Sequence, residues 1–159
     1  MRSITVTFDR FVAFAGPPAN AFQLARTGPG ATGNVAVAVD RSGSSPTKTV
    51  AKLTFTGTFT EGSAATPSLI DGNYTLTILS AQTLGGIQRG DNVTSLFRLF
   101  GDINGDKSVN GLDLTAFRGA FGTVSTDANY VSFLDFNGDG AINGTDLTQF
   151  RSRFGVILP

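Results

Sequence analysis

The feature that most constrains this chain is an internal repeat near its C-terminal end. The stretch 101–122, GDINGDKSVNGLDLTAFRGAFG, aligns without gaps on 134–155, LDFNGDGAINGTDLTQFRSRFG, and 13 of the 22 positions are identical. Each copy begins with Asp, Asn and Gly and continues with one Leu and two Phe at spacings i, i+3 and i+7, which is the pattern of one helical face. Gly122 and Gly155 follow as helix stops. The repeat therefore predicts two copies of one unit, an acidic loop followed by a short helix.

Oxygen-bearing side chains recur in each loop at the spacing that calcium requires. Calcium takes six to eight oxygen ligands, and a twelve-residue loop supplies them from positions 1, 3, 5, 7, 9 and 12, with the backbone carbonyl used at position 7. These positions hold Asp102, Asn104, Asp106, Ser108, Asn110 and Asp113 in the first copy, and Asp135, Asn137, Asp139, Ala141, Asn143 and Asp146 in the second. Every side-chain donor is a hard oxygen, which excludes soft metals. Two calcium ions are the predicted cofactors, and plain Asx-turns without an ion are the alternative.

The two loops differ at position 6, where the chain makes a sharp turn that favours a positive φ. Gly140 meets this need in the second loop, whereas Lys107 stands there in the first. A side chain in the left-handed conformation costs about 1 kcal/mol, so we expect the second loop to bind calcium more tightly. Position 8 is apolar in both copies, and we expect Val109 and Ile142 to pair the two loops through a short β-bridge.

Residues 1–100 show the period-two alternation of β-strands instead of a helical period. Turn-forming segments such as GPP, TGPGATG, RSGSSP and IDGN separate the apolar runs. We expect strands around 3–8, 22–24, 35–39, 49–57, 73–79 and 93–100. About seven short antiparallel strands, each with one apolar face, indicate an all-β sandwich.

Composition excludes several classes of function. The chain has no His and no Cys, which excludes disulfides, thiol nucleophiles and zinc sites built on imidazole or thiolate. Six of the seven acids in 101–159 lie in the two loops, so we expect no enzymatic activity. No basic tract indicates nucleic acid, and no apolar run is long enough to span a membrane. Carbohydrate binding by the β-region is disfavoured because there is no Trp and only two Tyr.

A calcium loop with an exiting helix but no entering helix, present twice, resembles the dockerin module. TSLFRLFG, which precedes the first loop, has the pattern of a strand. The dockerin pattern D-x-N-x-D-G-x-x-N-x-x-D-L is matched in full from Asp135 to Leu147, and from Asp102 to Leu114 with Lys107 in place of Gly. The resemblance implies a calcium-dependent protein-interaction module with a cohesin-like partner. It assigns partner binding to loop positions 10 and 11 and to the middle of each helix, at Gly111, Leu112, Arg118, Gly119, Gly144, Thr145, Arg151 and Ser152.

RSITVTFD at the start of the chain and DGNYTLTIL further on resemble a bacterial immunoglobulin-like module. The sequence thus predicts an immunoglobulin-like β-sandwich over 1–100, followed by a small α-helical dockerin-like module with two calcium loops over 101–159. This arrangement is similar to the C-terminal regions of large secreted planctomycete-type proteins. We therefore expect a fragment of a longer protein that is secreted or lies at the cell surface. The alternative function is a calcium-stabilised structural cap or stalk without a cohesin partner.

Overall fold

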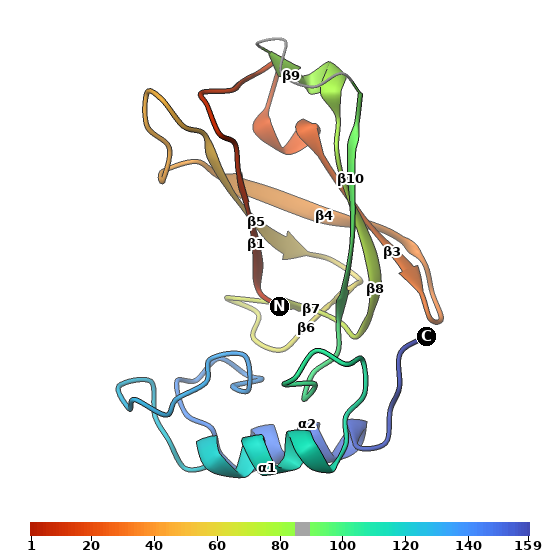
Figure 1. Ribbon diagram of the computed structural model, residues 1–159, viewed down its shortest axis with the longest axis vertical. Coiled ribbons are helices and arrows are strands. Elements are labelled where there is room, and N and C mark those ends of the chain that lie inside the picture. Colours follow the sequence, from red (N-terminus) through yellow and green to blue (C-terminus); the bar gives the residue numbers. More distant parts are fainter. Residues whose placement is uncertain (85–89) are drawn as a thin grey trace.

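The computed structural model describes residues 1–84 and 90–159, and it places a β-rich region on one side of two short helices (Figure 1). The longer strands form where the sequence alternates. They are β1 (Ser3–Thr7), β3 (Phe22–Gly28), β4 (Gly33–Asp40), β5 (Val50–Thr56), β8 (Gly72–Ile78) and β10 (Asn92–Arg98). Smaller elements were not predicted. They are the two-residue strands β2 (Ala13–Phe14), β6 (Thr60–Glu61), β7 (Ser68–Leu69) and β9 (Thr83–Leu84), and the 3-10 helices η1 (Pro18–Ala21) and η2 (Ser80–Gln82).

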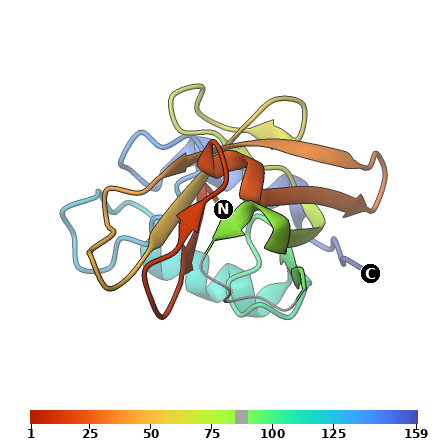
Figure 2. The ribbon, with the colours of Figure 1, turned by 90° about the horizontal axis from the view of Figure 1, so that it is seen from above.

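The longer strands form one antiparallel sheet in the order β1-β5-β4-β3-β8-β10. Strand β4 joins the two halves of this sheet, because residues 33–35 pair with β3 whereas residues 36–40 pair with β5. The sheet curls around its own core, and the hairpin of β3 and β4 projects to one side when the molecule is seen from above (Figure 2). The curl brings the two edge strands, β1 and β10, to opposite walls of one groove.

Alternate residues of these strands turn their side chains into a common apolar core. In β5, Ala51, Leu53 and Phe55 are buried, while the residues between them are exposed, as the pleat of a strand requires. Burial of a side chain such as Leu53 or Phe55 contributes about 1.5–3 kcal/mol. The buried hydroxyl of Tyr74 donates a hydrogen bond to the backbone carbonyl of Ile70 at 2.8 Å, so its burial leaves no unmet donor.

The immunoglobulin-like sandwich expected for residues 1–100 is not confirmed. A sandwich consists of two stacked sheets, whereas the strand pairing here continues through β4 from one half of the sheet to the other. A period-two pattern shows which face each strand buries, but it does not distinguish one curled sheet from two stacked ones. The last strand also ends at Arg98 and not at Phe100, which belongs to a second apolar cluster.

This second cluster surrounds α1 (Gly111–Ala120) and α2 (Gly144–Arg153), which lie antiparallel at one end of the β-region (Figure 1). The rings of Phe117 and Phe150 face each other with centroids 4.8 Å apart, and both are buried. The two predicted loop–helix units are therefore present. Within the described part of the chain, no helix combines the length and the apolar character needed to cross a membrane.

Candidate metal loops and helix face

The first loop begins at Asp102, whose carboxylate organises the turn that follows it. Oδ1 accepts hydrogen bonds from the N–H groups of Gly105 at 2.7 Å and Asp106 at 3.2 Å, and Oδ2 accepts one from the N–H of Lys107 at 2.9 Å. A short carboxylate side chain readily gathers nearby backbone N–H groups in this way. The loop is therefore folded around the side chain at position 1.

The second loop is folded around Asp135 in the same way. Its carboxylate accepts hydrogen bonds from the N–H groups of Gly138 at 2.6 Å and Gly140 at 2.9 Å, and a further one from the hydroxyl of Tyr130 at 2.6 Å. Burial, together with the hydrogen bond to Asp135, raises the pKa of Tyr130 to about 12. The Tyr130 hydroxyl therefore keeps its proton near neutral pH and remains a donor to Asp135.

Position 12 ties each loop to the helix that follows it. The buried carboxylate of Asp113 accepts hydrogen bonds from the N–H groups of Ile103 at 2.8 Å and Asn110 at 2.9 Å, and Asp146 makes the two equivalent contacts in the second loop. The amide oxygen of Asn110, at position 9, accepts a hydrogen bond from the N–H of Leu112 and completes a capping box, which the second repeat reproduces. Loop closure and helix initiation therefore use the same side chains.

The residues at position 6 both have a left-handed backbone, as predicted from the sharp turn. The φ angle is 67° at Lys107 and 85° at Gly140. Within residues 1–84 and 90–159, Lys107 is the one non-glycine residue with a positive φ. Its ammonium group donates a hydrogen bond to the backbone carbonyl of Pro159 at 2.9 Å, so the C-terminal tail fixes the position of this positive charge. The first loop thus adopts the turn with a side chain that disfavours it.

The prediction that Val109 and Ile142 pair with each other across the loops is wrong. Val109 exchanges backbone hydrogen bonds of 3.0 and 2.8 Å with residues 155–156, and Ile142 exchanges bonds of 2.9 and 2.8 Å with residues 122–123. The antiparallel arrangement of the helices explains this, because the start of each helix lies beside the end of the other. Each loop is therefore paired with the segment that follows the helix of the opposite repeat.

The donor chemistry of both loops fits calcium. Each loop offers carboxylates and amide oxygens at the required spacing, and all of these are hard oxygen donors. Among the described residues, no three acidic side chains lie close enough together to form a metal site as they stand. The carboxylates of Asp102 and Asp135 instead accept hydrogen bonds from backbone N–H groups of their own loops. An ionised carboxylate has about four acceptor sites, so capacity for an ion remains. The amide of Asn137, and next the N–H of Ala141, lower the pKa of Asp139 and keep that ligand position anionic.

All eight residues that the dockerin resemblance assigns to partner binding are exposed. They form two matching groups, Gly111, Leu112, Arg118 and Gly119 on α1, and Gly144, Thr145, Arg151 and Ser152 on α2. Leu112 leaves 70% of its surface exposed. Arg118 and Arg151 lie at the same groove between the helices, so at least part of each group shares one face.

This groove between α1 and α2 has a volume of about 510 Å³ and a symmetrical lining. Equivalent residues of the two repeats form it: Leu114, Phe117, Arg118 and Phe121, with Leu147, Phe150, Arg151 and Phe154. The sequence pattern placed both Phe residues of each repeat on one helical face, yet Phe117 and Phe150 are buried whereas Phe121 and Phe154 are 46% and 51% exposed. Both stand where a helix ends, and their extended backbone (ψ 133° and 125°) takes them out of the helical register. The sequence did contain a signal for this exposure, because each of these two Phe residues stands directly before the Gly that was predicted to stop its helix.

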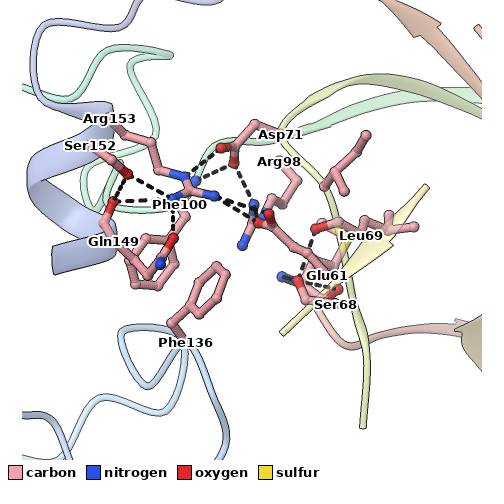
Figure 3. A network of polar contacts seen from close by, with 12 residues as sticks. Glu61, Ser68, Leu69, Asp71, Arg98, Phe100, Phe136, Gln149, Ser152 and Arg153 are labelled. Carbon is pink, nitrogen blue, oxygen red and sulfur yellow. Dashed lines mark hydrogen bonds and ion pairs between the residues drawn. The ribbon is translucent and has the colours of Figure 1, made fainter. Parts of the chain in front are cut away.

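An ion-pair network joins α2 to the β-region (Figure 3). Arg153 donates hydrogen bonds to the Asp71 carboxylate at 2.6 Å and to both oxygens of Glu61 at 3.0 Å. Arg98, at the end of β10, pairs with the same two carboxylates. Sequence analysis missed this contact, although one signal was available: the first repeat has Ala120 where the second has Arg153.

A search of curated proteins finds no match to this chain. Among solved structures, the chain is similar to chains of an N-terminal and a C-terminal interface mutant of a type II Cohesin-X-Dockerin complex from Acetivibrio cellulolyticus. The sequence identities are 18% and 22%, each match covers 96% of this chain and 96% of the other, and the TM-score is 0.35 in both cases. The family model of the Dockerin type I domain matches residues 100–154, the segment that contains both loops and both helices.

Proposed function

We propose that residues 101–159 are a calcium-dependent docking module that attaches a secreted or surface protein to a cohesin-like domain. The match of residues 100–154 to the Dockerin type I domain supports this. The observation that carries the proposal is the symmetry of the site, because two repeats with matching loops meet in one apolar groove. Residues 1–100 would then form a separate β-module that presents the docking module, which is the role we expect of an immunoglobulin-like module at this place in the chain.

Calcium would be held by the oxygen donors of the two loops, with one ion in each. Positions 1, 3, 5 and 12 supply side-chain oxygens, and position 7 supplies the backbone carbonyl of Ser108 or Ala141. Because Asn110 and Asn143 use their amide oxygens to cap the helices, we assign position 9 a contact through a water molecule, which is common in calcium loops. The ions would offset the mutual repulsion of the loop carboxylates and so favour folding.

The partner would bind on the face that carries the groove. Phe121 and Phe154 offer exposed apolar area at its rim, and Arg118 and Arg151 add a positive charge from each repeat. Aromatic and arginine side chains are the types that dominate binding energy at protein interfaces. The eight residues assigned by resemblance would contribute around this centre.

Calorimetric titration with a purified cohesin domain, in calcium and in EDTA, tests the proposal. We expect binding in calcium and none in EDTA. Replacing Phe121 and Phe154 together by Ala should weaken binding by more than about tenfold, because each truncation removes a central aromatic contact. Phe11→Ala is the matched control, since Phe11 is 50% exposed in the β-region. Binding that persists in EDTA, or an equal loss in the control, would contradict the proposal.

The ion-pair network of Figure 3 favours a second candidate function, a calcium-stabilised structural cap without a cohesin partner. Small modules often need a metal ion to reach adequate stability, and Arg153 fastens this one to the β-region. If calcium raises the melting temperature of the chain but no cohesin domain binds, the cap is the better account.

We also assign the protein to the outside of the cell. Calcium loops of weak to moderate affinity fill reliably where calcium is abundant. Fractionation of the native organism tests this, and recovery of the full-length protein in the cytosolic fraction would contradict it.

A further inference from the structure

We infer that two positioning residues, Arg2 of the β-region and Tyr130 of the segment between the helices, support the second calcium loop, and that neither of them supports the first. The inference rests on the calcium binding proposed above and gives the two sites different regulation. Neither residue stands at a ligand position. Each acts through the loop atoms that it contacts, Tyr130 on a ligand side chain and Arg2 on the backbone.

Tyr130 acts directly on the ligand at position 1. Its hydroxyl donates a hydrogen bond to Oδ2 of Asp135 at 2.6 Å, and Asp135 is buried. Hydrogen bonds from outside the ligand set fix the orientation of a metal ligand, and removing such a partner typically lowers metal affinity by about 10–100-fold. Because the hydroxyl is neutral, it orients the carboxylate without opposing the charge of the ion.

Arg2 lies directly before β1 and reaches from the β-region to the chain that leads into the second loop. Its guanidinium donates hydrogen bonds to the backbone carbonyls of Ser132 at 3.1 Å, Phe136 at 3.2 Å, and Asp135. A guanidinium is a rigid planar fork, so three simultaneous contacts fix the path of residues 132–136. Gly62 also packs on this segment, since a Cβ there would lie 2.8 Å from the carbonyl oxygen of Phe136. Two separate parts of the β-region therefore support the start of the second loop.

The first loop has different neighbours. When the repeat alignment is extended by four residues toward the N-terminus with the same offset, Phe97 falls opposite Tyr130, and a phenyl ring has no hydroxyl to donate. The C-terminal tail supports this loop instead, because the N–H of Leu158 donates a hydrogen bond to the carbonyl of Lys107 at 2.9 Å, and the Lys107 ammonium bonds Pro159. The side chain of Asn73 in β8 donates a hydrogen bond to the same Pro159 carbonyl at 3.0 Å. The first loop is thus linked to the β-region through the C-terminal tail, and not through Arg2 or Tyr130.

Coupling between a site and its support acts in both directions. If Arg2 stabilises the calcium-bound shape of residues 132–136, an ion in the second loop must stabilise the contact of those residues with the β-region. The link of the first loop to the β-region runs through Pro159 and Asn73 of β8 instead, and not through Arg2. Calcium in the second site should therefore tighten the junction with β1, and calcium in the first site should not.

Calorimetry on single-site variants tests the inference. Asp102→Ala disables the first loop, so the affinity of the second can be measured alone. In that background Tyr130→Phe should lower the calcium affinity by about tenfold or more. Arg2→Lys, which keeps the charge but loses the fork, should lower it by about threefold. In the Asp135→Ala background, both substitutions should leave the affinity of the first loop within about twofold, the change expected of a site without shared contacts.

Amide exchange provides a second readout. Calcium should slow exchange in residues 3–7 of the Asp102→Ala protein and leave it unchanged in the Asp135→Ala protein. Tyr74→Phe removes the other tyrosine hydroxyl of the chain, and Arg10→Lys changes an exposed arginine, so neither control should affect the second loop.

The outcomes separate this inference from the proposed function. If the Asp102→Ala protein binds no calcium, calcium binding by the second loop is itself refuted. If it binds calcium but Tyr130→Phe and Arg2→Lys leave the affinity unchanged, or if they weaken both loops equally, the specific support of the second loop by Arg2 and Tyr130 is refuted while calcium binding stands.

Discussion

The two repeats have similar sequences and different surroundings. The identical residues build the loops and helices: the recurring Asp and Asn of the loops, the Phe pair of each repeat and the Gly that follows each helix. The residues that differ make the outside contacts, as where Arg153 replaces Ala120 and bonds the β-region, or where Lys107 replaces Gly140 and bonds the C-terminal tail. The shared residues therefore define the unit, whereas the residues that differ determine how each copy is attached to the rest of the molecule.

Removing calcium should have the largest effect, because it acts on both repeats at once. Ions that bind only the folded state stabilise it by about 2.7 kcal/mol per site at a hundredfold excess over the Kd. We therefore expect EDTA to lower the melting temperature of residues 101–159 substantially. Thermal melts in calcium and in EDTA measure this, and identical curves would refute the assignment of calcium to the loops.

Breaking the attachment of the second repeat should have the next largest effect. Among the described residues, Arg153→Met leaves Arg98 as the ion-pair partner of Glu61 and Asp71. We expect the free energy of unfolding to fall by about 2 kcal/mol, which is less than for a fully buried pair because both carboxylates keep some exposure. Arg151→Met, on the exposed side of the same helix, is the control and should change stability by less than about 0.5 kcal/mol. Urea unfolding measures both, and equal losses would show that the network adds no stability.

The same attachment should make the two parts of the molecule tumble together. Only residues 99–101 separate the end of β10 from the first ligand position, and flexible joints usually need a longer polar segment. We expect one rotational correlation time for the β-region and the helices in NMR relaxation measurements. Independent correlation times in the unmodified, calcium-loaded protein would show that the network does not hold the two parts together.

The difference at position 6 should have the smallest effect. Lys107→Gly removes the left-handed strain from the first loop, so its calcium affinity should rise by about tenfold or less, the factor that corresponds to about 1.4 kcal/mol. Calorimetry in the Asp135→Ala background isolates this site. Ser108→Ala, which copies another difference between the loops at a position that uses its backbone carbonyl, should leave the affinity unchanged. An unchanged affinity after Lys107→Gly would mean that the strain does not weaken the first site.

Local chemistry was readable from the sequence, and contacts between distant segments were not. The longer strands, the loops, the helix ends shortly before Gly122 and Gly155 and the left-handed turn at Lys107 each depend on a few neighbouring residues. The continuous pairing through β4 and the contact of Arg153 with Glu61 depend on which segments meet in space. Periodicity assigns a face to each strand or helix, but it does not identify what covers that face.

The crosswise pairing of the loops also sets an order of events during folding. The N–H of Ile142 bonds the carbonyl of Thr123, which lies less than one repeat earlier in the chain. The N–H of Val109 bonds the carbonyl of Val156, which lies more than one repeat later. Closing a longer stretch of chain loses more entropy and is slower. The loop that comes first in the sequence should therefore close last. Pulsed amide exchange during refolding would show protection at Ile142 before Val109.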